Sequence, residues 1–169
     1  MNFELKELKK NMTEEIDSAF AIYQSNREYF HLTSGKELTR EFVIEDLEDL
    51  PPDTNPEKKQ FFGIYLDGEM IGLLDCVFGY PDEETYYLGL LMIDSRHQRK
   101  AYGTRILAEV EKQALEMGYK RIKLGVLEGN HKAFSFWGEM GFEYVKTVKR
   151  AGSDQVSRRV MVMEKELKG

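Results

Sequence analysis

The order of helix-type and strand-type apolar patterns is the feature that most constrains how this chain folds. Apolar residues recur every three or four positions over 13–26, 38–49, 104–117 and 132–140, which predicts four amphipathic helices. Strand-type runs at 3–8, 61–66, 70–78, 86–93, 120–127, 142–150 and 157–166 predict seven strands. Asp67-Gly68 predicts a tight hairpin between the second and third runs. The expected order, β-α-α-β-β-β-α-β-α-β-β, is that of an α/β fold with helices packed on one mixed sheet.

The length of the chain favours one domain over residues 1–169. The segment 50–56 is the one linker-like stretch and holds three of the four prolines. It is expected to end a helix, because roughly 55 preceding residues would make only a marginal domain.

Composition predicts a cytoplasmic protein without a metal site. Cys76 is the single cysteine, which excludes an intramolecular disulfide and a zinc site built on paired cysteines. His31, His97 and His131 are scattered, and His97 is expected to be an exposed loop residue. No apolar run approaches the roughly 18 residues of a membrane span, and residues 1–6 lack the pattern of a signal peptide.

The charges are distributed unevenly along the chain. The net charge of −6 argues against a nucleic-acid partner. Residues 37–93 hold 14 acidic against 3 basic side chains, a net of −11, whereas 94–132 hold 9 basic against 5 acidic, a net of +4. Solvated faces explain most such charges, but the division also suits a protein that holds an anionic cofactor beside a cationic substrate.

The most informative segment is the polar loop over residues 94–103, which connects an expected strand to an expected helix. The start of a helix presents backbone N–H groups without internal partners at the positive end of the helix dipole, and so binds phosphate. Arg99 and Lys100 add positive charge, and the small residues Ala101 and Gly103 let an anion approach the backbone. An ordinary basic loop before a helix is the alternative interpretation of this segment alone.

Two motifs in this half of the chain resemble those of one family. The run 98–103, QRKAYG, is similar to the Q/R-x-x-G-x-G/A signature of the GCN5-related N-acetyltransferase (GNAT) superfamily. The run 130–142, NHKAFSFWGEMGF, is similar to the Asn-x-x-Ala, aromatic and Gly-Phe block of the same superfamily. One helix and one strand separate the two motifs, as in the family, and the resemblance covers about residues 61–145.

The resemblance implies a GNAT-like sheet whose strands 86–93 and 120–127 splay apart to hold acetyl-CoA as co-substrate. The loop amides would contact the pyrophosphate, the end of the first splayed strand would pair with the pantetheine arm, and the second motif would border the arm and the thioester. The residues that these roles imply for the cofactor are Leu91, Met92, Ile93, Gln98, Arg99, Lys100, Ala101, Tyr102, Gly103, Thr104, Asn130, Ala133 and Trp137.

Two positions depart from the family pattern. Ala101 stands where the family usually has glycine, which is tolerable if its φ angle is negative. Trp137 stands where many members have a tyrosine that protonates the departing thiolate, and an indole N–H does not titrate. Another group could act as the acid, or the thiolate could leave unaided, because thiols have a pKa near 8.5.

The catalytic base stays open among several groups. Tyr87 aligns with the glutamate of the histone-modifying branch, while Glu84 and Asp75 are the nearest carboxylates in the pattern. Water relayed to bulk solvent is the competing account. Tyr29 and His31 fall in the connection that often covers the acceptor site of this fold.

The resemblance thus implies an N-acetyltransferase that acetylates a primary amine, either a small cationic amine or a peptide amine, by direct attack on acetyl-CoA. A non-catalytic acyl-CoA sensor is the alternative, supported by the missing tyrosine. A purely structural domain is a third interpretation, which the two motifs disfavour. The acetyltransferase could also form a homodimer, and no membrane partner is expected.

Overall fold

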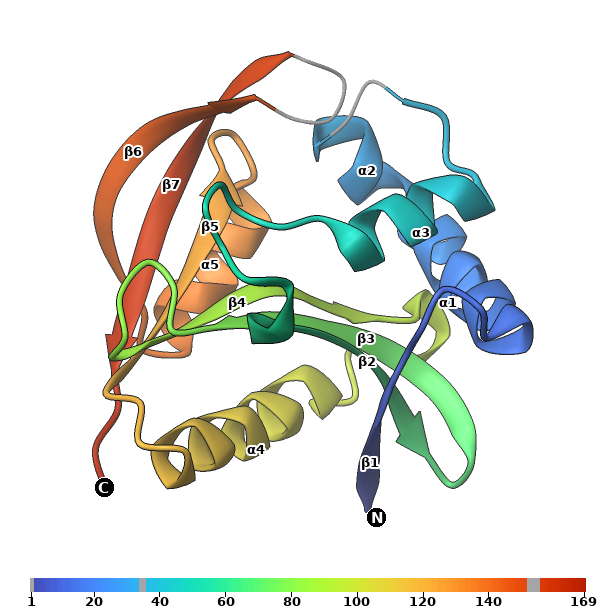
Figure 1. Cartoon of the computed structure of the whole chain (residues 1–169), viewed down its shortest axis with the longest axis horizontal. Coiled ribbons are helices and arrows are strands. Elements are labelled where there is room, and N and C mark those ends of the chain that lie inside the picture. Colours follow the sequence, from blue (N-terminus) through green and yellow to red (C-terminus); the bar gives the residue numbers. More distant parts are fainter. Residues whose placement is uncertain (1, 34–35, 152–155) are drawn as a thin grey trace.

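A seven-stranded mixed sheet with strand order β1-β2-β3-β4-β5-β7-β6 organises the protein (Figure 1). The structure is a computed structural model that describes residues 2–33, 36–151 and 156–169. Strands β4 and β5 run parallel, and all other neighbours are antiparallel. The strands are β1 (Phe3–Glu7), β2 (Lys59–Leu66), β3 (Glu69–Phe78), β4 (Thr85–Ile93), β5 (Arg121–Leu127), β6 (Glu143–Ala151) and β7 (Ser157–Glu166). The helices are α1 (Thr13–Ser25), α2 (Arg27–Thr33), α3 (Arg40–Glu48), α4 (Tyr102–Glu116) and α5 (His131–Glu139).

The expected α/β fold is confirmed, with one helix that the sequence pattern did not predict. Helix α2 has only seven residues, too few for a clear helical periodicity. Tertiary packing holds it in place: the ring of Phe30 stacks on Tyr23 of α1 at 4.5 Å and meets Phe42 of α3 edge-on at 5.7 Å. Short 3₁₀ turns at Pro56–Lys58 and Ser95–His97 complete the elements.

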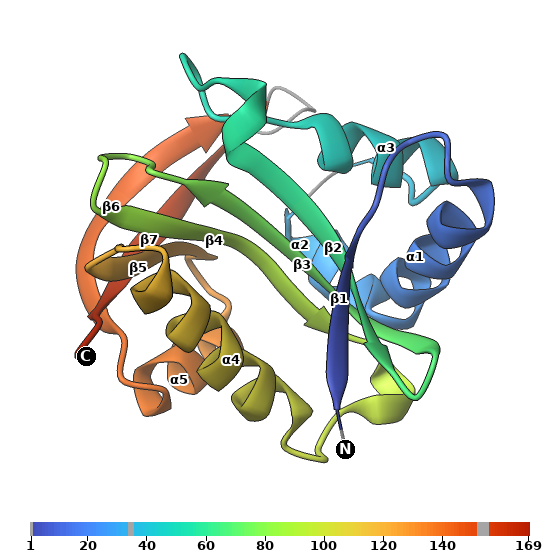
Figure 2. The same ribbon diagram turned by 60° about the horizontal axis from the view of Figure 1, so that its bottom comes forward.

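Helices cover both faces of the sheet, as Figures 1 and 2 show together. Helices α4 and α5 pack on one face, and α1, α2 and α3 pack on the other. In α4 the expected apolar stripe is buried at Ile106, Val110 and Ala114, but Met117 lies beyond the helix end and is 51% exposed. In the part of the chain that the structure describes, no helix is long and apolar enough to cross a membrane.

Two irregularities in strand pairing determine which side chains meet on the α1–α3 face. The β2–β3 register shifts between Ile64 and Tyr65, and the β3–β4 register shifts between Asp75 and Cys76. Because successive side chains point to opposite faces of the sheet, a register shift of one residue moves every later side chain of that strand to the other face. The first shift places Lys59 on the same face as Asp75, and the second leaves Gly89 of β4 unpaired and exposed.

Candidate active site

The central parallel strands separate soon after they begin, as expected. Strand β4 pairs with β5 only over Thr85–Tyr87, opposite Arg121–Lys123. Further along, the Asp94 N–H donates to the carbonyl of Ile71 on β3 at 2.8 Å. Because backbone groups alternate between the two edges of a strand, those of Leu91 and Ile93 face the gap toward β5. Beyond Tyr87 this edge of β4 therefore has no strand partner, and we call the gap beside it the β4–β5 opening. An extended, amide-containing molecule can pair with an edge of this kind.

The loop after β4 delivers backbone amides to the same opening. Arg99 has φ +64°, and Ala101, the residue before α4, has φ +61°. The condition of a negative φ at Ala101 is therefore not met, and alanine adopts a left-handed conformation that favours glycine. A Cβ atom on Gly103 would come no closer than 3.8 Å to another residue, to Cζ of Phe136. Packing within the protein thus does not require glycine at 103, whereas the close approach of an anion would.

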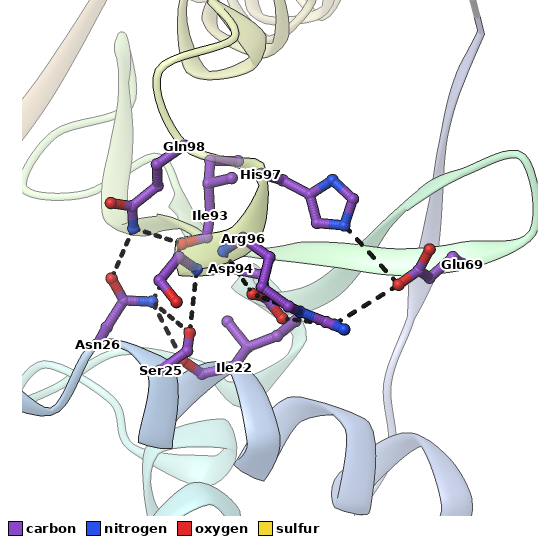
Figure 3. A network of polar contacts seen from close by, with 10 residues as sticks. Ile22, Ser25, Asn26, Glu69, Ile93, Asp94, Arg96, His97 and Gln98 are labelled. Atoms are coloured by element: carbon purple, nitrogen blue, oxygen red, sulfur yellow. Dashed lines mark hydrogen bonds and ion pairs between the residues drawn. The ribbon is translucent and has the colours of Figure 1, made fainter.

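A network of side-chain amides ties this loop to the end of α1 (Figure 3). The Ile93 carbonyl accepts hydrogen bonds from Asn26 Nδ2 at 3.0 Å and from Gln98 Nε2 at 2.8 Å. Gln98 Nε2 also donates to Asn26 Oδ1 at 2.8 Å. The Ser95 N–H donates to Ser25 Oγ at 3.1 Å. The first residue of the loop motif therefore binds the protein itself, and α1 fixes the far end of β4.

The expectation that His97 is an exposed loop residue is wrong. Its side chain is only 19% exposed, with Nε2 3.7 Å from Glu69 Oε1, toward which it points in Figure 3. Its ring lies 6.3 Å from the ring of Tyr102, which is buried against Phe3. The His97 ring thus lies against β3, and the Tyr102 ring packs against β1 at the first residue of α4.

The second motif forms the start and the inner side of α5. Asn130 is the N-cap, and its Oδ1 accepts from the Ala133 N–H at 3.2 Å. Trp137 is half-buried and meets the rings of Phe136 and Phe142 edge-on at 5.0 and 5.3 Å. Capping thus occupies the side-chain oxygen of Asn130 and leaves its amide nitrogen to donate.

On the α1–α3 face, Asp75 lies against the irregular part of β4. A Cβ atom on Gly89 would sit 3.2 Å from Asp75 Oδ2. The same oxygen accepts from Lys59 Nζ at 3.1 Å, whereas no residue in the described ranges donates to the buried Oδ1. Burial raises the pKa of Asp75 to about 6, and the neighbouring Lys59 opposes that rise. A carboxylate with one oxygen unused and a pKa below neutrality can receive an ammonium group or take its proton.

A second carboxylate and two tyrosines surround Asp75. Tyr23 donates its hydroxyl to Asp46 Oδ2 at 2.9 Å, and burial raises the pKa of Asp46 to about 6. Lys59 Nζ also donates to the carbonyls of Asp46 and Asp49, at 2.8 and 2.6 Å. Burial raises the pKa of Tyr29 to about 12, and the charges of Asp46, Tyr87 and Asp75 add to that rise. Tyr29, which the resemblance implies for the acceptor site, therefore lies near the same cluster as Asp75.

The remaining candidates lie in different surroundings. Tyr87 stands where β4 and β5 separate, and its hydroxyl accepts from Arg150 Nη1 at 2.8 Å. Glu84 directly precedes β4, is exposed, and pairs with Lys120 at 2.8 Å, which lowers the pKa of Glu84. His31 is exposed on α2. The structure brings Asp75, Tyr87 and Tyr29 together and leaves Glu84 apart from them.

Sequence reasoning missed Lys59, Asp46, Arg150 and Asn26. Lys59 meets Asp75 only because of the β2–β3 irregularity, since a regular hairpin from Asp67-Gly68 would turn Lys59 to the other face. Arg150 reaches the site from β6 across β7, a strand order that local patterns do not contain. Among residues 2–33, 36–151 and 156–169, no group of His, Cys, Asp or Glu could hold a metal ion.

Comparisons with known proteins agree with the fold. The profile of the acetyltransferase (GNAT) family matches residues 18–142. An acetyltransferase from Thermus thermophilus superposes with a TM-score of 0.77 at 28% identity, covering 99% of this chain and 98% of that one. PaiA N-acetyltransferase from Thermoplasma acidophilum, solved with coenzyme A, has the same fold at 18% identity, with a TM-score of 0.65 and coverage of 98% and 99%.

A curated relative is similar over a shorter stretch. L-ornithine N5-acetyltransferase NATA1 of Arabidopsis thaliana is 26% identical over 102 residues, which cover 58% of this chain and 44% of the relative. The chain thus matches less than half the length of that relative. The family match spans most of the described sheet, from α1 through α5, and on that basis the chain belongs to the acetyltransferase (GNAT) family.

Proposed function

We propose that the protein transfers the acetyl group of acetyl-CoA to a primary amine that enters from the α1–α3 face. The observation that carries this proposal is the position of Asp75. Its carboxylate lies beside the exposed Gly89 of β4 through Oδ2, which also accepts from Lys59, and its buried Oδ1 has no partner among the described residues. A carboxylate at that place can orient an incoming ammonium group and accept its proton.

Acetyl-CoA would be held by the loop, by α4 and by the open edge of β4. The first-turn amides of α4 and the cationic Arg99 and Lys100 suit the pyrophosphate. The room beside Gly103 supports this fit. The backbone of Leu91 and Ile93 suits the pantetheine amides, although the Ile93 carbonyl already accepts from Asn26 and Gln98. Met92, Tyr102, Thr104, Asn130, Ala133 and Trp137 complete the proposed binding residues.

The chemistry that we propose needs one proton acceptor and no protein acid. Asp75 takes a proton from the ammonium group, and the neutral nitrogen forms a bond with the acetyl carbonyl carbon. The carbon–sulfur bond breaks, and CoA leaves as a thiolate, which is acceptable for a thiol with a pKa near 8.5. The nitrogen, which gains a positive charge when it bonds to carbon, loses its second proton to water. Trp137 therefore does not need to replace the tyrosine found in other members. Tyr87 would border the reacting amine, and Asp75 would return its proton to bulk water.

The acceptor that we propose is cationic. Asp46 and Asp75 lie in the acidic part of the chain, net −11 over residues 37–93, which attracts amines in their ammonium form. The partial likeness to an ornithine N-acetyltransferase supports a small basic amine over a peptide. The reducing cytoplasm is the location that we propose, and cell fractionation with an antibody to the protein would test it.

The release of free CoA, measured with a panel of diamines, amino sugars, basic amino acids and peptides, tests the proposed function. We expect acetyl-CoA-dependent release with at least one small cationic amine. Gly103→Asp should weaken acetyl-CoA binding at least ~10-fold by calorimetry, because one charge-assisted contact contributes about 1.5–3 kcal/mol. Ala108→Asp adds the same charge to an exposed position of α4 outside its first turn and serves as the control. Tight acetyl-CoA binding without turnover of any amine would point to a sensor.

A further inference from the structure

A cation, Arg150, stands at the edge of this acidic face. Arg150 lies on the edge strand β6, and its side chain extends across β7 toward β5 and β4. Its Nη1 would lie 3.5 Å from a Cβ atom on Gly125, and it donates to the Tyr87 hydroxyl at 2.8 Å. The absence of a side chain at Gly125 therefore makes room for Arg150 and Tyr87 to meet where β4 and β5 separate.

The charge of Arg150 is not neutralised by a carboxylate in the described parts of the chain. Its contacts there are with Tyr87, by that hydrogen bond and with the guanidinium carbon 5.9 Å from the ring centroid. A guanidinium group carries five N–H donors in a planar fork that matches a carboxylate, and it stays charged at every working pH. The protein thus presents a cation with unused donors beside the site where acetyl transfer is proposed.

Arg150 and Asp75 lie on the same face at a distance that one small molecule can span. Asp75 pairs with Leu90, and Val77 pairs with Tyr87, so Asp75 and Tyr87 are diagonal neighbours on adjacent strands. Such neighbours are roughly 7–8 Å apart, and Arg150 lies beyond the Tyr87 hydroxyl. The amine and carboxylate on one α-carbon are too close together to reach both groups. With a chain of several methylenes between its amine and its carboxylate, one molecule would reach both Asp75 and Arg150.

We propose that the acceptor is an amino acid with a distal primary amine, whose carboxylate binds Arg150 while the amine faces Asp75. This inference rests on the proposed function and adds the class of its substrate. Arg150 sets specificity in this scheme and takes no part in proton transfer. Tyr87 orients the guanidinium group through its hydroxyl.

Matched acceptors separate the contribution of the carboxylate from that of the amine. Cadaverine is L-lysine without its carboxylate, and 6-aminohexanoate is L-lysine without its α-amine. L-ornithine, putrescine and 5-aminopentanoate repeat the comparison with one methylene fewer. In at least one series, we expect the KM of both carboxylate-bearing acceptors to be at least ~10-fold below that of the diamine, as for one charge-assisted contact.

Arg150→Gln should remove this preference by raising the KM of the carboxylate-bearing acceptors at least ~10-fold while leaving that of the diamine unchanged. Lys149→Gln removes the same charge from the neighbouring residue, which points to the other face of β6, and should keep the preference. Equal KM values for diamines and carboxylate-bearing acceptors in the unmodified protein would overturn the inference. An equal effect of Arg150→Gln on both would also overturn it.

A binding measurement keeps this inference separate from the proposed function. Calorimetry of 6-aminohexanoate and of hexylamine against the CoA-bound protein needs no turnover. Tighter binding of 6-aminohexanoate that is lost in Arg150→Gln supports the carboxylate site even if no acceptor is acetylated. No difference between the two ligands contradicts the site even if amines are acetylated.

Discussion

Asp75 and Glu84 illustrate how surroundings separate two carboxylates that look alike in the sequence. Glu84 is exposed and paired with Lys120, so the charged form is favoured and its pKa is lowered. Asp75 is largely buried, with a pKa raised to about 6 and one oxygen without a donor in the described structure. A base that works near neutral pH needs the second kind of environment.

We expect Asp75→Asn to lower kcat by ~10²-fold, the lower end of the usual contribution of a general base. Glu84→Gln should change kcat less than twofold, and steady-state release of CoA measures both. Acetyl-CoA affinity, measured on each variant, shows that the fold and the cofactor site persist. Equal losses in the two variants would mean that the acceptor approaches from elsewhere.

Ala101 carries a backbone strain that a smaller residue would relieve. Its φ of +61° places an L side chain in the left-handed region, which costs about 1–2 kcal/mol. Ala101→Gly removes the Cβ atom but adds freedom to the unfolded chain, so we expect a net gain of about 1 kcal/mol in the free energy of unfolding. Urea denaturation measures it, and Ala108→Gly in the interior of α4 should instead destabilise the protein by a similar amount. A loss of stability in Ala101→Gly would contradict the left-handed geometry.

At the scale of elements, the contact between α1 and the end of β4 couples helix α1 to the loop that follows β4. Asn26 and Gln98 share both a mutual hydrogen bond and the Ile93 carbonyl (Figure 3). Removal of either side chain leaves the other with fewer hydrogen-bond partners. The effects of substituting Asn26 and Gln98 on the free energy of unfolding should therefore not add.

A double-mutant cycle with Asn26→Ala, Gln98→Ala and the double variant measures this coupling. We expect an interaction of about 0.5–1.5 kcal/mol in the free energy of unfolding. Ser95→Ala, which keeps its backbone N–H bond to Ser25, should add independently to Asn26→Ala. Additive effects of Asn26 and Gln98 would show that the two amides do not interact.

Local patterns predicted most elements but not the strand irregularities. Four helices and seven strands follow from periodicity, and the turn at Asp67-Gly68 follows from its residue types. The shift between Ile64 and Tyr65 depends on how whole strands pack, and it decides that Lys59 meets Asp75. The loop motif was visible because backbone chemistry demands small residues locally. The proposed acceptor side was predicted only in part. Asp75, Tyr87 and Tyr29 were named, whereas Asp46, Lys59 and Arg150 were not, because the tertiary fold alone brings these residues of α3, β2 and β6 together.

At the scale of the whole molecule, two buried carboxyl groups make stability depend on pH in an unusual direction. The folded-state pKa values of Asp46 and Asp75 are raised to about 6, above the usual value near 3.9 in the unfolded chain. The folded protein therefore binds more protons than the unfolded chain between about pH 4 and 6. Stability should rise as the pH falls from 7.5 to 5.5. It should fall below about pH 4, where Asp82 and Asp94, whose pKa values are lowered, become protonated.

Thermal unfolding at pH 7.5, 6.5 and 5.5 in one ionic strength tests this dependence. We expect a higher Tm at pH 5.5 than at pH 7.5, and a flatter dependence in Asp46→Asn, which keeps an acceptor for the Tyr23 hydroxyl. A Tm that decreases steadily over this range would mean that neither carboxyl group is held in a desolvated state.

The most direct test of the central claim, acetyl transfer to an amine with Asp75 as the base, is the pH dependence of kcat. Both substrates are kept saturating, and CoA release is followed from pH 5 to 9 in the unmodified protein and in Asp75→Asn. The account predicts that kcat rises through a single ionisation near pH 6 and then levels off, without the falling limb of an essential acid, and that Asp75→Asn loses this rise. The same rising limb in both proteins, or a bell-shaped profile, would contradict it.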